Sequence, residues 1–267
     1  MSLDLKNMMM TAQRAVIESR ALLLDYFGKL KRVDQKVRAG LVSEADIESE
    51  KLITKILSAE FPNHKILGEE ASYAKGKIEK PKSDQPLWVI DPLDGTTNYV
   101  HGFSIFCISI GLWYKEEAVL GVIDAPALDA TYTAIKGQGA FKNGLPISVS
   151  SRSNLKDSLL ATGFYTEDLP SLTEQIRVFS NLMSKTRGIR RAGAAAYDLC
   201  MVAEGIFDAF WEKSLSPWDV AAGGVIVKEA GGRVTDYQGA KFNIFDNNVL
   251  ATNKHLHQTL VKEIGLK

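Results

Sequence analysis

The first part of the chain carries helical and extended patterns of apolar residues in turn. Apolar positions recur at helical spacing from Leu3 to Lys31 and from Glu44 to Ala59, which predicts two opening helices. The short apolar run Leu87–Ile90 ends just before an Asp-Pro pair and predicts a buried strand that stops there. A longer run, Ser104–Ile123, predicts two further strands.

Beyond Ser150, strands and helices alternate. The pattern predicts strands at residues 158–162, 206–211 and 248–251, and helices at residues 171–184, 194–203, 218–229 and 254–264. This change predicts two halves, an α+β half over residues 1–150 with most of the candidate metal ligands and an α/β half over residues 151–267. The fold class is therefore α/β.

Composition and charge exclude several classes of protein. With 45% apolar residues in a chain of 267, a substantial core can form. The 32 basic and 32 acidic residues cancel, so no net field draws the protein to nucleic acid or to an acidic membrane. The apolar runs are shorter than the ~20 residues of a membrane span, and Asp4 and Lys6 interrupt any signal-peptide pattern. Cys107 and Cys200 show no pairing pattern, so we expect free thiols and a reducing compartment, the cytoplasm.

The densest candidate chemistry is the segment Asp91-Pro92-Leu93-Asp94-Gly95-Thr96-Thr97-Asn98. Two carboxylates leave a predicted strand together, and Gly95 lets the backbone approach a ligand closely. We expect Thr96 to open a short helix, whose N–H groups can hold a phosphate while the carboxylates hold cations. The alternative is an ordinary turn in which Thr96 only caps a helix.

Two further acidic motifs weaken that alternative. Gly68-Glu69-Glu70 ends a strand-like stretch, and Asp219 follows Trp218 at the start of an apolar helix. Asp219 as a simple helix cap, and Glu69 with Glu70 as a solvated pair, are the competing interpretations. Carboxylate and carbonyl oxygens are typical of Mg²⁺ sites, and no Cys or His cluster in the sequence indicates zinc or iron.

Other motifs predict no site. His255 and His257 lie two residues apart on a predicted helix, which favours a surface position over a pair of metal ligands. The sequence has no P-loop and no dinucleotide fingerprint, and the glycines between Gly137 and Gly144 predict a hairpin turn. Nucleotide-dependent group transfer is therefore disfavoured.

The acidic motifs, in this order and at this spacing, resemble the signatures of the inositol monophosphatase family. The segments that carry the resemblance are Gly68-Glu69-Glu70, Trp88 to Asn98, Gly137 to Gly144, Arg191 to Ala195 and Trp218 to Gly232. The resemblance covers nearly the whole chain. It implies the layered α/β/α/β/α sandwich shared by inositol monophosphatases and fructose-1,6-bisphosphatases, a homodimer, two to three Mg²⁺ ions in each site and sensitivity to lithium.

The resemblance also implies a role for each site residue. One Mg²⁺ would be held by Glu69, Asp91 and the Leu93 carbonyl, a second by Asp91, Asp94 and Asp219, and a third, weaker ion would lie near Glu69. Asp46 would hydrogen-bond Thr96, and Glu69 and Thr96 would orient the attacking water. The implied substrate-binding residues are Asp94, Gly95, Thr96, Gly193, Ala194, Glu212 and Asp219.

The implied reaction is Mg²⁺-dependent hydrolysis of a small phosphate monoester, with inositol-1-phosphate as the first hypothesis. The family usually carries Ser or Thr where this chain has Ala194, so one hydroxyl beside the substrate is missing. Fructose-1,6-bisphosphate, histidinol phosphate and 3′-phosphoadenosine 5′-phosphate are the alternative substrates. Some bacterial members of the family bind RNA polymerase during antitermination, which makes such a partner the second alternative. Membrane binding and direct nucleic-acid binding are not expected.

Overall fold

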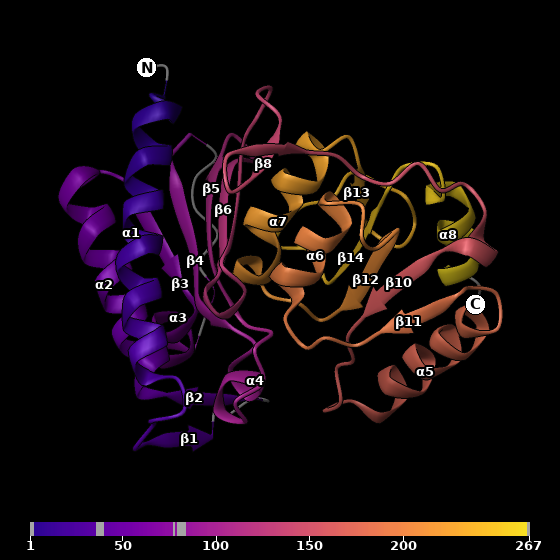
Figure 1. The fold of residues 1–267 in the computed structure, drawn as a ribbon, viewed down its shortest axis with the longest axis horizontal. Helices are drawn as coiled ribbons and strands as arrows, with labels where there is room; N and C mark the ends of the chain where they lie inside the picture. The colour runs from indigo at the N-terminus through magenta and orange to yellow at the C-terminus, as the bar shows by residue number, and fades with distance from the viewer. Residues whose placement is uncertain (1–2, 36–39, 77, 79–83, 266–267) are drawn as a thin grey trace.

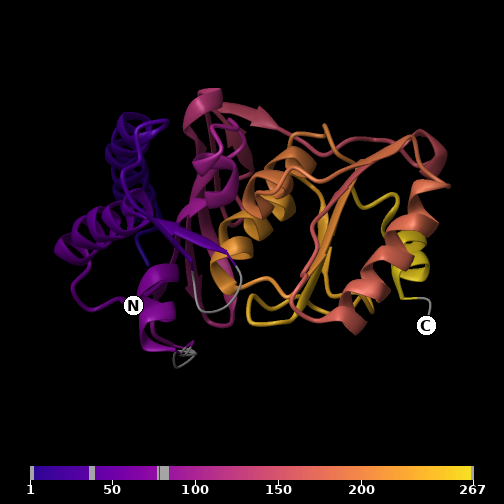
Figure 2. The same ribbon diagram turned by 90° about the horizontal axis from the view of Figure 1, so that it is seen from below.

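The computed structural model describes residues 3–35, 40–76, 78 and 84–265. Within these residues, two β-sheets alternate with three layers of helices, and the fold is an α/β/α/β/α sandwich (Figure 1). Figure 2 shows the same succession of layers from below. The outer layers are α1 (Leu5–Tyr26) with α2 (Glu44–Glu60) and α5 (Leu169–Met183) with α8 (His257–Ile264), and the central layer is α6 (Ala195–Ala203) with α7 (Pro217–Glu229). The layered fold implied by the sequence is confirmed.

The larger sheet lies between the α1/α2 layer and the central layer. Its strands, in spatial order, are β3 (Lys65–Gly68), β4 (Leu87–Asp94), β5 (Cys107–Tyr114), β6 (Glu117–Ala125), β7 (Ala130–Ile135), β8 (Ala140–Lys142) and β9 (Leu145–Ile147). The pair β3 and β4 is parallel, and each following pair is antiparallel. Short helices follow the first two strands, α3 (Glu69–Lys75) after β3 and α4 (Thr96–Val100) after β4.

The smaller sheet lies between the central layer and the α5/α8 layer. Its strands, in spatial order, are β11 (Gly188–Arg190), β10 (Leu159–Thr162), β12 (Ala209–Lys213), β14 (Asn248–Thr252) and β13 (Arg233–Thr235). Strand β10 pairs in parallel with β11 and β12, whereas β14 is antiparallel to both of its neighbours. A two-stranded ribbon, β1 (Val33–Gln35) and β2 (Leu41–Ser43), precedes α2. Turns of 3₁₀ helix lie at Pro126–Leu128 and Leu155–Asp157.

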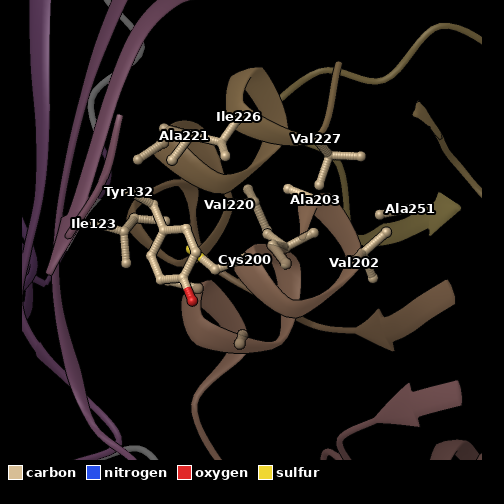
Figure 3. Close-up of a cluster of buried hydrophobic side chains, with 14 of the residues drawn as sticks. Ile123, Tyr132, Cys200, Val202, Ala203, Val220, Ala221, Ile226, Val227 and Ala251 are labelled. Atoms are coloured by element: carbon tan, nitrogen blue, oxygen red, sulfur yellow. The ribbon is translucent and has the colours of Figure 1, made fainter. Parts of the chain in front are cut away.

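Three hydrophobic clusters fill the spaces between the layers, and the central one covers both sides of the α6/α7 layer. In β4, Trp88 and Ile90 pack toward α1 and α2, while Leu87 and Val89 belong to the cluster around α6 and α7. Successive residues of a strand face opposite sides of the sheet. A strand that is covered on both faces of the sheet therefore has a continuous run of apolar residues in its sequence. Figure 3 shows the central cluster, where Tyr132 from the large sheet meets Cys200 of α6. The third cluster lies between the small sheet and the α5/α8 layer.

Two glycines bring α7 unusually close to the large sheet. Gly111 and Gly121 are partners across β5 and β6. A Cβ at Gly111 would lie 2.8 Å from the Cβ of Ala221, and one at Gly121 would lie 2.5 Å from the Ala222 carbonyl oxygen. Larger side chains would push α7 away from the sheet. This close packing sets where the start of α7, and hence Asp219, lies relative to β4.

Most predicted elements are confirmed, including both opening helices and the hairpin between Gly137 and Gly144. The strand predicted at 206–211 instead begins at Ala209, because the N–H groups of Ile206 and Phe207 both bond back to the Met201 carbonyl and prolong the end of α6. The short elements α3, β11 and β13 were not predicted, since three to seven residues carry too little periodicity.

The Lys-rich, Gly-containing composition of the segment from Ala74 to Gln85 predicts an exposed loop. The segment lies partly outside the described residues, and its first two residues belong to α3, which runs to Lys75. The surface position predicted for His257 is wrong. Its side chain is fully buried between Thr235 and Thr252, and both threonine hydroxyls hydrogen-bond its ring nitrogens. Among the described residues, no helix is both long and apolar enough to cross a membrane.

Candidate active site

Strand β4 carries both carboxylates of the Asp91–Asn98 motif. The sequence predicted that the strand stops at Asp91, but it continues to Asp94. Its pairing with β5 shifts register between Asp91 and Asp94, around Pro92. Proline has no N–H for a ladder hydrogen bond, so a bulge is where a strand can accommodate it. Because the bulge accommodates Pro92, both Asp91 and Asp94 belong to β4.

Gly95 turns the chain from β4 into α4. It adopts the left-handed conformation with φ of 88°, and an added Cβ would lie 2.9 Å from the Ile105 carbonyl oxygen. Both the conformation and the close approach call for glycine. Helix α4 begins at Thr96, so the predicted helix is confirmed, although it is only one turn long.

The hydroxyl of Thr96 links α4 to the start of α2. Thr96 Oγ1 donates to Asp46 Oδ1 at 2.9 Å and also lies 3.0 Å from the Leu93 carbonyl oxygen. The other oxygen of Asp46 accepts from the backbone N–H and the hydroxyl of Ser43, which forms a capping box at the start of α2. Asp46 is completely buried, and its oxygens are fixed by helix geometry.

Asp91 is the most deeply buried of the candidate carboxylate ligands. It is 2% exposed, and burial raises the pKa of its carboxyl well above the usual range. The negative charges of Glu69, Asp94 and Asp219 raise this pKa further. None of these influences comes from a basic side chain. The structure therefore brings together four acidic residues that lie up to 150 positions apart in the sequence, at a buried point where their like charges oppose one another.

The carboxylate of Asp94 is held by groups from two other elements. Its Oδ2 accepts from the Ala196 N–H at 2.7 Å, in the first turn of α6, and from the Cys107 thiol at 3.7 Å. Burial raises the pKa of Asp94 to about 7, although both hydrogen bonds act to lower it. Asp94 and Cys107 are register partners across β4 and β5.

Asp219 caps its own helix and also lies in the acidic cluster. Its Oδ2 accepts from the Ser216 N–H at 2.7 Å, so it caps α7. Its charge also raises the pKa of Asp91 and of Glu212. Capping therefore orients the Asp219 carboxylate without removing it from the acidic cluster.

The predicted substrate-side residues border the same cluster. Burial, followed by the charge of Asp219, raises the pKa of Glu212 to about 8. Glu212 lies against Gly163, where an added Cβ would come within 2.1 Å of its carboxylate. The methyl of Ala194 would lie 3.2 Å from a Cβ on Gly95, and Gly193 lies beside the Asn98 side chain. The loop before α6 thus packs directly on the β4–α4 turn.

A cavity of about 1580 Å³ opens beside this cluster, between α2, α3 and the residues before α7. Glu69 and Asp219 form part of its wall. Both also act on the buried Asp91, so they connect the acidic cluster to open space.

The acidic cluster suits divalent cations by charge and by ligand type. Burying several carboxylates of like charge close together is unfavourable, and oxygen ligands of this kind are those that Mg²⁺ prefers. In the ranges that the structure describes, no three acidic, His or Cys side chains converge into a preformed cage. The carboxylates of Asp91, Asp94 and Asp219 instead accept hydrogen bonds from backbone N–H groups.

Three polar residues near the cluster were not predicted from the sequence. Glu50 follows Asp46 by one helical turn, a spacing that places both on one face of α2 and could have indicated it. Cys107 depends on strand register, which the sequence does not reveal. Asp198 of α6 is buried, with Oδ1 lacking a hydrogen-bond partner, and the charges of Glu212 and Asp94 help to raise its pKa.

Known proteins are similar to this chain in sequence and in fold. The model of the inositol monophosphatase family matches residues 4–265. Inositol monophosphatase 3 of Solanum lycopersicum is 42% identical over 95% of both chains, and a fructose-1,6-bisphosphatase/inositol-1-monophosphatase of Aquifex aeolicus is 38% identical over 97% of this chain and 96% of that one. The crystal structure of the extragenic suppressor protein suhB from Bartonella henselae superposes with a TM-score of 0.88 at 38% identity, covering 97% of this chain and 98% of that one. With the acidic cluster in place on this fold, the chain belongs to the inositol monophosphatase family.

Proposed function

We propose that this phosphoric monoester hydrolase releases phosphate from a small polyol monoester in a reaction that requires Mg²⁺, with inositol-1-phosphate as the first candidate substrate. The observation that carries the proposal is the buried Asp91, whose carboxyl is surrounded by three further acidic residues. A cluster of this kind has no evident structural benefit, because its charges repel one another. It becomes favourable when cations are bound.

The proposed ligands are divided between two ions. Glu69, Asp91 and the Leu93 carbonyl would hold the first, and Asp91, Asp94 and Asp219 the second. Bound Mg²⁺ would neutralise phosphate charge, lower the pKa of water and stabilise the leaving alkoxide.

Thr96 is proposed to orient the attacking water. Its single hydroxyl proton is directed to the charged carboxylate of Asp46, the stronger of its two nearby acceptors. The lone pairs of Thr96 Oγ1 are then available to accept a hydrogen bond from water. Asp46 thereby determines which way the hydroxyl points, and we assign it a positioning role.

The β4–α4 turn and the loop before α6 are proposed to bind the substrate. Backbone N–H groups of Gly95 and Thr96 would hold phosphate oxygens, as glycine-led helix starts do. Asp94, Glu212 and Asp219 would accept hydrogen bonds from polyol hydroxyls, while Gly193 and Ala194 would pack against the polyol. The methyl of Ala194 offers no hydroxyl to the substrate, so we expect turnover of several small polyol phosphates.

The test is phosphate release from inositol-1-phosphate, fructose-1,6-bisphosphate, histidinol phosphate and 3′-phosphoadenosine 5′-phosphate, with Mg²⁺ and with EDTA. We expect Mg²⁺-dependent turnover that is fastest for inositol-1-phosphate. Asp94→Asn should lower kcat at least about 100-fold, whereas Asp25→Asn, at an exposed aspartate of α1 that pairs with Lys29, should not. Full turnover in EDTA, or an active Asp94→Asn variant, would refute the assigned site.

A further inference from the structure

Glu50 of α2 binds the backbone at the start of α3. Its Oε2 accepts from the Glu70 N–H at 2.7 Å, and its Oε1 accepts from the Ala71 N–H at 2.9 Å. The side chain is 7% exposed. A carboxylate that accepts two N–H groups at a helix start forms strong, charge-assisted hydrogen bonds and complements the helix dipole. Glu50 therefore fixes the first turn of α3, in which Glu69 is the first residue.

Gly68 lets Glu50 reach this position. An added Cβ at Gly68 would lie 2.5 Å from the Glu50 carboxylate carbon. The Gly68 backbone has φ of −99° and ψ of 152°, which alanine adopts without strain. Glycine is thus required here by contact with Glu50 and not by its own conformation.

Two other residues of α2, Asp46 and Ser49, hydrogen-bond segments of the candidate site. Asp46 accepts from Thr96, and Ser49 Oγ donates to the Pro92 carbonyl oxygen at 3.0 Å. The spacing 46, 49 and 50 places all three on one face of the helix. A rigid helix that contacts α3, β4 and α4 fixes the relative positions of these three segments.

We propose that Glu50 is a positioning residue that places Glu69 for divalent-cation binding by fixing the junction between β3 and α3. This inference rests on the proposed function, in which Glu69 holds a cation. Glutamine at position 50 would keep one carbonyl acceptor but turn an NH₂ group toward a backbone N–H, so one hydrogen bond would be replaced by a repulsive contact. Glu69 would then lose its fixed position.

The first test compares Glu50→Gln with Glu48→Gln, an exposed glutamate of the same helix. Binding of Mg²⁺ alone is measured by calorimetry, and kcat and KM are measured at saturating Mg²⁺. We expect Glu50→Gln to weaken Mg²⁺ binding about tenfold to hundredfold and to lower kcat with little change in KM, while Glu48→Gln matches the wild type. A Glu50→Gln variant that melts at a lower temperature but binds Mg²⁺ normally would show a structural role only and overturn the inference.

A double-mutant cycle addresses the same contact from the other side. Gly68→Ala should weaken Mg²⁺ binding in the wild-type background, because its methyl displaces the Glu50 carboxylate. In the Glu50→Ala background the space is open, so the added effect of Gly68→Ala should vanish. Additive effects would overturn the inference while leaving the proposed function intact. A wild-type protein that binds no Mg²⁺ would overturn both.

Discussion

Two buried aspartates, one at each sheet, lie in opposite electrostatic settings. Asp208, at the start of β12 in the small sheet, is fully buried, and its carboxylate accepts from the Leu159 N–H at 2.8 Å, from the Ser150 hydroxyl and from Arg152. Asp91, at the large sheet, is buried to nearly the same degree but faces other carboxylates.

The comparison shows how burial can serve stability at one position and chemistry at another. Around Asp208 the donors are Ser150 and Arg152, which precede β10, and Leu159 of β10, so its carboxylate ties the segment before β10 to the sheet. Around Asp91 the neighbouring charges have the same sign, so the buried, ionised carboxylate is electrostatically unfavourable. Perturbed carboxylates of this kind are typical of functional sites, and the cations proposed above would offset their repulsion.

The largest expected effect comes from exchanging Asp91 for asparagine. Asp91→Asn removes a proposed cation ligand, so kcat should fall about 1000-fold. The variant also relieves like-charge repulsion, so its melting temperature in EDTA should equal or exceed that of the wild type. Phosphate release and thermal melting measure both outcomes. A marked loss of stability in EDTA would contradict the contrast with Asp208.

The second prediction is the converse exchange at the small sheet. Asp208→Asn turns an NH₂ group toward the donors that surround this position, and the free energy of unfolding should fall by about 3 kcal/mol. Urea denaturation measures this, with Asp157→Asn, an exposed aspartate paired with Arg187, as the control that should change stability by less than about 1 kcal/mol. We expect kcat of the folded Asp208→Asn variant to be unchanged. A loss of turnover would place Asp208 in the active site.

A third prediction concerns pH and the buried His257 of α8. Burial lowers the pKa of His257 to about 4, from an ordinary value of 6.5. Because the folded state resists protonation of this ring, its contribution is fully present above pH 6.5 and is lost as the pH falls toward 4. The wild type should therefore lose about 2 kcal/mol more than His257→Gln between pH 7.5 and pH 5. Urea denaturation at both pH values measures the difference, and His255→Gln, which changes an exposed histidine, should behave as the wild type does.

The smallest expected effect concerns the Thr96 hydroxyl. Thr96→Val removes the group that donates to Asp46, and kcat should fall about tenfold. Thr96→Ser keeps the hydroxyl and should retain most of the activity. Steady-state kinetics at saturating Mg²⁺ measures both variants. Equal activity of the two would show that the hydroxyl has no part in turnover.

The sequence alone predicted the long elements and the segments that carry the acidic residues. Helices α1 and α2 and strands β5 and β6 each contain many residues of regular hydrophobic period, so they can be predicted without knowledge of the tertiary structure. Pro92 misled the prediction, because its missing N–H usually ends a strand, while here a bulge allows β4 to continue. His257 misled it as well, since two-residue spacing on a helix says nothing about which residue faces the sheet.

The sequence by itself determined the acidic and glycine-containing motifs and the family to which the chain belongs. Short motifs in a fixed order can be recognised without knowledge of the fold. Only the tertiary structure decided that Asp91 is buried among like charges, that Cys107 stands opposite Asp94 and that Glu50 holds the start of α3. Each of these depends on strand register or on the packing of a helix against a distant turn. Such contacts join residues that are far apart in the chain, and their positions are set by the fit of whole layers and not by local preference.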